Sequence, residues 1–361
     1  MFKNRGNILL IIAFIAAAVF ALGGGIFYSL SKKTSTPSGD SPAESPPTTS
    51  IEVQEKEEVV PTIAPVKDNT LDILFMGVGG AGHEGGTLSD SITLARFNTD
   101  KKTLTLIAIP RDLWVPVPAG GANRTWQKIN MAYSKGGGNL SKYVVGQTLA
   151  INVDHYITVD FGSFVSGVNE LGGIDVEVAK SWDDYFYPIK GAELATCNFT
   201  IEEINQFHNK YSGFELEKQF TCRFEHLHFD KGMQHLDGET ALKFIRSRHS
   251  AQYGSDFARG EKAQAVLLAI GKKLLNQGVL DPSNATFKKL VGFVKSDISL
   301  SGAGTILKTI GDLNSYQIKH LYLTDQNVLT AAKSSGGAFI LIPKAGSGNF
   351  DELRSFVKSD D

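Results

Sequence analysis

The chain has few cysteines and no excess of basic charge. Its 361 residues include only two cysteines, so disulfides cannot hold it together and its stability must come from a packed core. The 36 lysines and arginines are balanced by 38 aspartates and glutamates, giving a net charge of −2. This balance argues against a nucleic-acid backbone as the main partner. Hydrophobic residues make up 42% of the chain and charged residues 20%, which excludes global disorder.

Several catalytic motifs are missing as well. No Gly-x-Ser-x-Gly elbow, His-Glu-x-x-His or Cys-x-x-Cys occurs, so hydrolases and zinc proteases have little support. Residues 77–82 match G-x-G-x-x-G, but the following His-Glu-Gly-Gly-Thr-Leu-Ser-Asp cannot open a helix, and no Gly-Lys-Ser/Thr follows. A dinucleotide site and a P-loop are therefore excluded. The segment is either a flexible glycine loop or a loop whose backbone approaches a phosphate closely.

A long apolar segment lies near the N-terminus. Residues 8–30 contain no charge and are long enough, at about 1.5 Å per helical residue, to cross a hydrocarbon core of about 30 Å. We expect a transmembrane helix after a cytoplasmic tail at 1–7, with the rest of the chain outside the cell. A cleaved signal peptide is the alternative, although the apolar run is longer than usual and no clean cleavage site follows. Either way the bulk of the chain is exported.

The following residues divide into a spacer and a globular part. Residues 31–69 are rich in Pro, Ser, Thr and Glu, a composition that predicts a disordered linker. Residues 70–361 then form the folded region. Alternating strand and helix patterns predict an α/β fold, a layered sheet with helices on its faces. The expected strands are Leu71–Val78, Ile92–Asn98, Thr103–Ile109, His155–Val159 and Ile174–Val178, and the expected helices Leu140–Ile151, Phe161–Leu171 and Gly260–Asn276.

Four arginines flank loops and apolar elements in a pattern that suits a phosphate. Arg111 follows Pro110 at the end of a strand, where open α/β sheets bind ligands. If Arg246 and Arg248 lie in extended chain, their spacing puts both guanidinium groups on one side. Arg259 stands where a helix begins, and the positive end of the helix dipole disfavours a cation there unless an anion is also bound. Together they suit a multidentate phosphate or pyrophosphate, whereas any one alone could be a solvated surface charge.

Other residues suggest a metal site and a disulfide. Asp90 follows the glycine loop at the mouth of a strand, where a carboxylate is either a Mg²⁺ ligand or a turn residue. In an exported chain, Cys197 and Cys222 are expected to form a disulfide, worth about 3 kcal/mol by loop entropy. A zinc site that combines them with His226 and His228 is less favoured, because the spacing fits no standard pattern.

The ordered motifs resemble the LytR-CpsA-Psr family. They run through LDILFMGVGG, SDSITLARFN, LIAIPRDLWVPV, KINMAYSKGG, HYITVDFGSFVSGVNELGGIDVEV, HLDGETALKFIRSRH and DFARGEKAQAVL, from about Leu71 to Lys273. Members are single-pass bacterial membrane proteins with an extracytoplasmic catalytic domain. They move anionic glycopolymers such as teichoic acid from a polyprenyl-pyrophosphate carrier to peptidoglycan. The resemblance further implies Mg²⁺, an α/β/α-type fold with a central mixed sheet, and an apolar tunnel for the lipid tail.

By motif position, the resemblance also implies roles for particular residues. Asp90 corresponds to a metal-binding aspartate, and Arg111, Arg246, Arg248 and Arg259 to pyrophosphate-binding arginines. Lys128, Asp256 and Gln264 match positions near the site. One feature departs from the family: its aspartate after the first strand is missing, because the strand here ends Gly77-Val78-Gly79-Gly80. His83 or Glu84 is the expected substitute ligand.

These residues predict a phosphotransferase that acts by positioning and charge neutralisation. Arg111, Arg246 and Arg248 are the expected catalytic residues, with Asp112 or Asp256 as a candidate general base. Polyprenyl-pyrophosphate-linked glycopolymer, peptidoglycan and membrane lipid are the expected partners, and the apolar helices are expected to line the tail's tunnel. Two alternatives remain: a module that binds polyprenyl phosphates without turnover, and a pyrophosphatase that releases the polymer to water.

Overall fold

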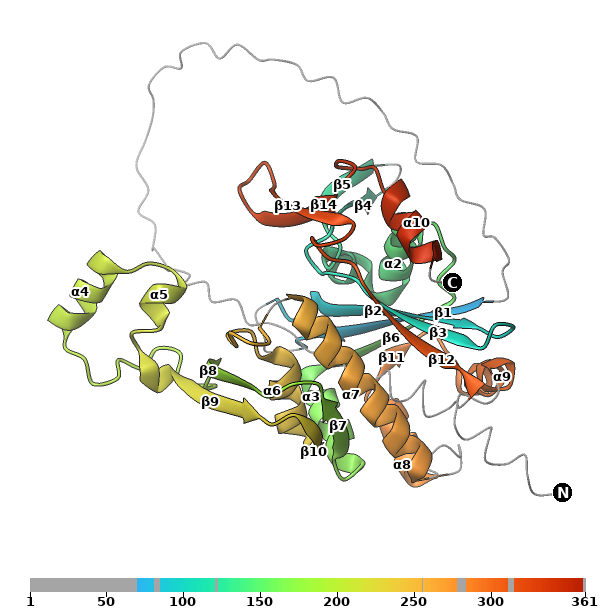
Figure 1. The fold of residues 1–361 in the computed structure, drawn as a ribbon, viewed down its shortest axis with the longest axis horizontal. Coiled ribbons are helices and arrows are strands. Elements are labelled where there is room, and N and C mark those ends of the chain that lie inside the picture. The colour runs from blue at the N-terminus through green and yellow to red at the C-terminus, as the bar shows by residue number, and fades with distance from the viewer. Residues whose placement is uncertain are drawn as a thin grey trace, which may run out of the picture.

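A six-stranded mixed sheet lies at the centre of the molecule (Figure 1). The computed structural model describes residues 70–80, 85–120, 123–254, 256–277, 284–310 and 315–359. The strand order is β11-β6-β1-β2-β3-β12. β1, β2 and β3 are antiparallel neighbours, whereas β6 is parallel to β1 and β12 is parallel to β3. The strands are β1 (Thr70–Val78), β2 (Ser89–Asn98), β3 (Thr103–Ala108), β6 (His155–Asp160), β11 (Lys295–Ser296) and β12 (Gln317–Tyr322).

Alternation along the strands gives the sheet two buried faces. Ile73 and Phe75 of β1 belong to one hydrophobic cluster, and Leu74 and Met76 to another. Side chains of successive strand residues point to opposite faces, so a strand whose residues are all apolar must be covered on both sides. The predicted α/β fold with a central mixed sheet is confirmed. Because β1 continues into an antiparallel β2, the glycine segment after β1 is not part of a Rossmann βαβ unit.

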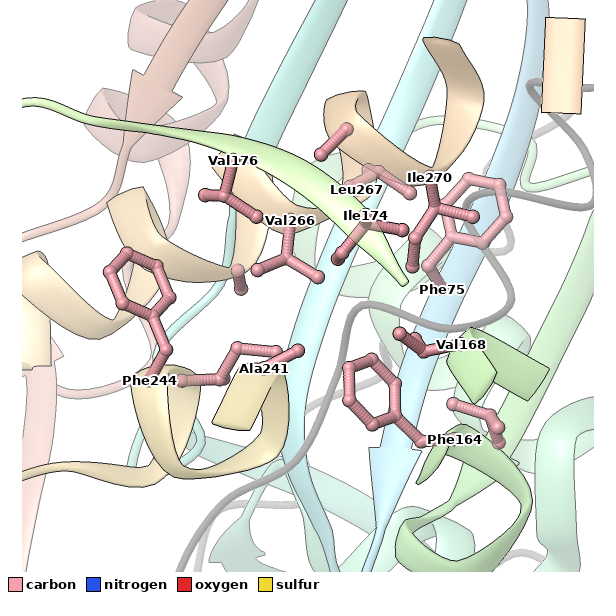
Figure 2. Packing of buried hydrophobic residues seen from close by; sticks show 14 of the residues in the cluster. Phe75, Phe164, Val168, Ile174, Val176, Ala241, Phe244, Val266, Leu267 and Ile270 are labelled. Carbon is pink, nitrogen blue, oxygen red and sulfur yellow. The ribbon is translucent and has the colours of Figure 1, made fainter. Parts of the chain in front are cut away.

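The first face is covered by helices and by β7 (Figure 2). Figure 2 shows Phe164 and Val168 of α3, Ala241 and Phe244 of α6, and Val266 of α7 pointing toward one another. These side chains are almost fully buried, which accounts for the helical spacing of the apolar residues in the sequence. The elements are α3 (Phe161–Glu170), β7 (Ile174–Val178), α6 (Gly238–Arg246) and α7 (Asp256–Asn276).

The opposite face is covered by two helices and two hairpins. Leu149 of α2 and Leu353 of α10 are buried against this face. The elements are α2 (Met131–Leu149), α10 (Asp351–Ser359), β4 (Trp114–Gly120) paired with β5 (Asn123–Lys128), and β13 (Leu329–Lys333) paired with β14 (Phe339–Pro343). Helix α2 begins before the expected Leu140 and bends at Gly136 and Gly137, whose backbone is not helical. Two glycines break the apolar periodicity, so the sequence pattern shows only the second half of the helix.

A separate arm extends from one side of the domain (Figure 1). Its base is the hairpin of β8 (Trp182–Pro188) and β9 (Phe224–Phe229), and Cys197 and Cys222 form a disulfide within it. This is the pairing expected from the sequence, and the alternative zinc site with both cysteines is excluded because the two sulfurs are bonded to each other. The remaining elements are α4 (Ile201–Lys210), α5 (Phe214–Glu217), a 3₁₀ turn (Thr221–Arg223), β10 (Gly232–Leu236), α8 (Ala285–Gly292) and α9 (Leu300–Ile310).

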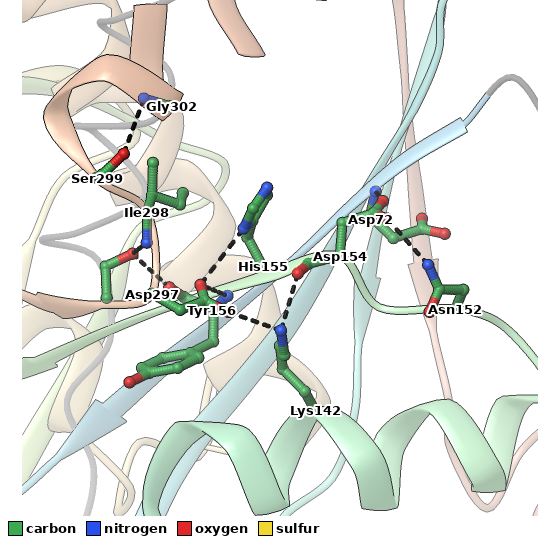
Figure 3. Close-up of polar contacts among 11 residues, drawn as sticks. Asp72, Lys142, Asn152, Asp154, His155, Tyr156, Asp297, Ile298, Ser299 and Gly302 are labelled. Atoms are coloured by element: carbon green, nitrogen blue, oxygen red, sulfur yellow. Dashed lines mark hydrogen bonds and ion pairs between the residues drawn. The ribbon is translucent and has the colours of Figure 1, made fainter. Parts of the chain in front are cut away.

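Polar contacts fasten the short edge strand β11 (Figure 3). Asp297, just after β11, accepts hydrogen bonds from the Lys142 ammonium at 2.6 Å and from the Tyr156 backbone N–H at 2.9 Å. Lys142 also donates to the carbonyl of Asp154 at 2.8 Å. A two-residue strand has little pairing of its own, so these bonds join β11 to both β6 and α2.

The expected membrane helix at 8–30, the tail at 1–7 and the linker at 31–69 lie outside the described residues. Within the described part of the chain, no helix combines the length and apolar character that a membrane span requires.

Candidate functional site

A cavity of about 370 Å³ opens where β2 begins and β3 ends. Its wall includes Asp90, Arg111 and Arg259, next to apolar side chains from both strands and from the segment after β12. The apolar part includes Ile92, Ala108, Ile109, Ile245, Leu323 and Leu341. The structure thus places charged and apolar surface in one cavity, as a lipid with an anionic headgroup requires.

The lining bears on the expected tunnel helices 140–151, 161–171 and 260–276. Phe164 of α3 and Val266 of α7 pack into the core with no exposed surface, whereas Ala265, Leu268 and Ala269 of α7 line a second cavity of about 400 Å³. Only the first turn of α7, at Arg259 and Gly260, reaches the first cavity. Periodic apolar residues identify a buried helix face without distinguishing a core from a cavity, so the sequence could not separate the two.

A chain of ion pairs links Asp90 to Lys128. The Nη1 atom of Arg111 donates to Asp90 Oδ1 at 2.5 Å, and its Nε lies 3.4 Å from Asp112 Oδ2. Lys128 Nζ lies 2.5 Å from the other oxygen of Asp112. Arg111 and both aspartates are largely buried. Because both oxygens of Asp112 contact cations, this carboxylate is suited to holding Arg111 and Lys128 in place and not to accepting a proton.

Arg246 and Arg248 lie at and just after the end of α6, and neither is among the described residues that line the cavity. Arg246 is the last residue of the helix, so the two arginines are not in extended chain as the sequence suggested. The Arg246 guanidinium lies 4.7 Å from the centre of the Phe161 ring, a cation–π contact. After the helix, the backbone turns and directs Arg248 toward Asp90 and Arg111, whose charges act on it.

A buried carboxylate fixes that turn. Asp184 of β8 has no exposed surface, and its Oδ2 accepts hydrogen bonds from the Ser247 hydroxyl at 2.7 Å and from the backbone N–H groups of Arg248 and His249 at 3.1 Å each. From the other side, Lys262 Nζ donates to the carbonyl of Ser247 at 3.0 Å. The direction of Arg248 therefore depends on two buried charges that the sequence analysis did not single out.

The sequence indicates burial for only one of these two charged residues, Lys262. Lys262 sits four residues after Ala258 and four before Val266, on the apolar side of α7, where a charge is out of place. Asp184 lies within Trp182-Asp-Asp-Tyr185, and nothing in this segment marks its burial.

Burial and mutual repulsion disfavour the charged form of two arginines. Burial, together with repulsion from the neighbouring Arg248 and Arg111, lowers the pKa of Arg259 to about 9. Burial likewise lowers the pKa of Arg248 to about 10, with Arg111 adding to the effect. Within the described part of the chain, the buried Nε and Nη2 atoms of Arg248 have no hydrogen-bond partner. Buried cations without matching anions are costly, and a bound polyanion supplies both the charge and the acceptors.

One candidate residue stands apart from this cluster, and three others cannot be placed. Gln264 is buried in α7, donates to the Leu106 carbonyl at 3.2 Å and contacts His320 Nδ1, so both ends of its amide already have partners. It is absent from the described lining of the cavity. His83 and Glu84 lie outside the described residues, as does the side chain of Asp256.

The donor set at Asp90 fits a magnesium ion that is shared with a ligand. Burial raises the pKa of Asp90 despite the lowering effect of Arg111, Arg248 and Arg259, so its charge is not fully compensated. Magnesium usually binds one or two carboxylates and completes its shell with water and substrate phosphate. Both oxygens of Asp112 contact cations, whereas the ion pair between Asp90 and Arg111 is made through Asp90 Oδ1. Asp90 together with phosphate oxygens is therefore the fitting donor set.

Comparison with known proteins identifies the family of this chain. Residues 33–339 match the LytR_cpsA_psr family, so the chain belongs to it. It is 28% identical over 267 residues to the polyisoprenyl-teichoic acid–peptidoglycan teichoic acid transferase TagV of Bacillus subtilis (strain 168), covering 74% of this chain and 59% of TagV. It is 25% identical over 266 residues to the regulatory protein MsrR of Staphylococcus aureus (strain COL), covering 73% of this chain and 67% of MsrR.

Solved structures support the same fold. The crystal structure of B. subtilis TagV superposes with a TM-score of 0.54 and 26% identity, covering 81% of this chain and 98% of that one. TagT bound to LI-WTA superposes with a TM-score of 0.52 and 23% identity, which shows the fold alone. The match to TagV spans less than two thirds of the relative's length.

Proposed function

We propose that this chain is a phosphotransferase that moves an anionic glycopolymer from a polyprenyl-pyrophosphate carrier to peptidoglycan. The observation that carries the proposal is a group of buried guanidinium groups: Arg111 and Arg259 line a partly apolar cavity, and the charge of Arg248 acts on both Arg259 and Asp90. The names of relatives such as TagV supply the substrate class. A pyrophosphate has several negative charges in a small volume, which matches Arg111, Arg248 and Arg259 better than a single carboxylate would.

The apolar wall would hold the first part of the lipid. Ile92, Ile109 and Leu341 line the same cavity as the arginines. With the pyrophosphate on the arginines, a polyprenyl chain would leave the headgroup along this apolar surface and be removed from water. A free nucleotide or sugar diphosphate would leave this apolar surface uncovered. The cavity therefore favours a lipid-linked donor.

The chemistry would be a displacement at phosphorus. An acceptor hydroxyl of peptidoglycan attacks the phosphorus that carries the polymer. The new P–O bond forms as the bond to the bridging oxygen breaks, polyprenyl phosphate leaves, and the proton of the acceptor hydroxyl passes to the leaving phosphate or to water. Charge develops on the leaving phosphate, where guanidinium groups held in place beforehand stabilise it without reorganisation. Arg111, Arg246 and Arg248 are our proposed catalytic residues, and Asp112 and Lys128 position Arg111.

A magnesium ion on Asp90, when bound, would neutralise phosphate charge alongside the arginines. We propose the ion as a cofactor shared between Asp90 and the donor's phosphate oxygens.

The location that we propose is the outer face of a bacterial membrane. Residues 8–30 would serve as the single membrane anchor and 31–69 as a spacer. The Cys197–Cys222 disulfide is in keeping with an oxidising compartment outside the cytoplasm. An anchored domain stays close to a membrane-embedded donor, which raises the donor's effective concentration.

A binding module without turnover is the second candidate. Two observations favour it: a relative carries the name regulatory protein, and Gly79 replaces the aspartate that the family has after its first strand. Such a module would hold the lipid pyrophosphate on the same arginines and release it unchanged.

A transfer assay separates these functions. The full chain in detergent would be given a polyprenyl-pyrophosphate-linked polymer fragment and peptidoglycan strands, with and without Mg²⁺, and the products weighed by mass spectrometry. Polymer phosphate joined to glycan, with release of polyprenyl phosphate, is the result expected. Donor binding with no product would favour the binding module. Polymer phosphate released free into solution, with none joined to glycan, would favour a pyrophosphatase.

A further inference from the structure

Two imidazoles and a carboxylate converge on the β8–β9 hairpin, away from the arginine cluster. Asp183 of β8 is the direct cross-strand partner of His228 in β9. His226 lies two residues before His228, so the two rings share one face of the strand. His226 Nε2 and His228 Nδ1 each lie 2.8 Å from Asp183 Oδ1. In the described part of the chain, this is the one group of three or more His, Cys, Asp or Glu residues compact enough for a metal ion.

Neighbouring side chains hold both rings in this orientation. The other nitrogen of His228, Nε2, lies 3.2 Å from Asp230 Oδ1. Metal-binding histidines commonly donate their second N–H to a carboxylate in this way, which fixes the tautomer and leaves the opposite nitrogen to face the metal. The ring of Tyr185 stacks on His226 with a centroid distance of 4.2 Å and an angle of 6°. Both potential ligand rings are therefore oriented before a metal binds.

We propose that Asp183, His226 and His228 form a binding site for a divalent transition metal of the zinc type. Imidazole nitrogen with one carboxylate oxygen suits zinc and its neighbours, whereas magnesium and calcium prefer oxygen alone. Three protein ligands leave a fourth position for water or an external group. About half of each imidazole is exposed, so an ion can enter from solvent.

The metal would link the two strands at the base of the arm that contains the Cys197–Cys222 disulfide. It would join β8 to β9 next to the irregular pairing between Asp184 and Tyr187. Asp183 also precedes Asp184, the carboxylate that holds the turn of Arg248. The site depends on none of the residues that bind the donor in our proposed function, so its test is independent of that proposal.

The direct test is a titration of the full chain in detergent with ZnCl₂ after treatment with a chelator. Isothermal titration calorimetry is expected to show one strong site per chain, which His228→Ala abolishes. Asp230→Asn is expected to weaken affinity by about 10- to 100-fold, since it removes only the carboxylate that orients His228. His235→Ala is the matched control, because His235 is also an exposed histidine on a carboxylate, at 2.7 Å from Asp175.

A spectroscopic measurement supports the titration. Co²⁺ in place of zinc is expected to give the visible absorption of a four-coordinate site in the wild type and in His235→Ala, and to lose it in His228→Ala. Circular dichroism of each variant confirms that it folds. The proposal is overturned if no equivalent of zinc binds, or if His226→Ala and His228→Ala bind it as the wild type does.

Discussion

The backbone N–H of Arg248 donates a hydrogen bond to the buried Asp184 carboxylate at 3.1 Å. The same oxygen accepts two further hydrogen bonds, from the Ser247 hydroxyl and the His249 N–H. One carboxylate in β8 therefore sets the conformation of a turn about 64 residues later in the chain. The position of Arg248 is therefore fixed through its backbone.

Replacement of Asp184 is the first prediction. Asp184→Asn keeps the shape but removes the charge, which weakens the hydrogen bonds that converge on Oδ2. We expect the free energy of unfolding to fall by about 1–3 kcal/mol, measured by denaturant unfolding. Donor affinity is expected to fall as well, because the turn of Arg248 loosens. Asp175→Asn, at an exposed position of β7, is the control; equal effects of both substitutions would contradict a positioning role for Asp184.

The arginine cluster gives the second prediction. Arg246→Ala is expected to lower transfer by about 10²- to 10³-fold, the usual effect of removing one stabilising donor of developing charge. Stability should change little, because the Arg246 side chain makes a ring contact at the edge of the core and no buried ion pair in the described residues. Arg124→Ala, on β5, is the control. Activity at the wild-type level in Arg246→Ala would exclude this arginine from the site.

Magnesium gives the third prediction. Asp90→Asn is expected to abolish any Mg²⁺-dependent gain in affinity for inorganic pyrophosphate while leaving metal-free binding intact, because Arg111 loses its carboxylate partner and is freed for the ligand. Calorimetry with and without Mg²⁺ measures both quantities without turnover. An unchanged Mg²⁺ effect in Asp90→Asn would place the metal elsewhere.

The buried Lys262 gives the fourth prediction, a dependence of stability on pH. Burial lowers the pKa of Lys262 to about 7 from an ordinary value of 10.5. Between these values the unfolded chain holds more protons than the folded one, so the free energy of unfolding rises with pH across this range. Below pH 7 both states are protonated, and the penalty for the buried charge stays constant.

The variant Lys262→Met removes that group while keeping its length. We expect the unfolding free energy of the variant to rise less steeply between pH 7 and 10 than that of the wild type. Lys272→Met, at an exposed position of α7, is expected to keep the wild-type slope. Identical slopes in all three proteins would show that Lys262 titrates normally in the folded state.

Much of the fold could be predicted because its strands and helices carry strong periodic patterns. Ile73 to Met76 are apolar throughout, and this property by itself requires cover on both faces. The start of α2 could not be predicted, since Gly136 and Gly137 interrupt its pattern. The β4–β5 and β13–β14 hairpins were missed as well. In β4 the buried Val115 and Val117 alternate with Pro116 and Pro118, and proline argues against a strand.

The sequence by itself determined the composition of the site: which arginines and aspartates are present, and that two cysteines are available to pair. The order of the residues and their side-chain chemistry are enough to determine this composition. Only the tertiary structure decided that Arg111, Arg248 and Arg259, from three separate elements, surround Asp90. It also decided that Gln264 faces inward to β3 and that Asp184 and Lys262 hold the turn of Arg248. The burial of a side chain and its electrostatic interactions with residues far away in the chain depend on how distant segments pack. A local sequence pattern does not encode the distances between those segments.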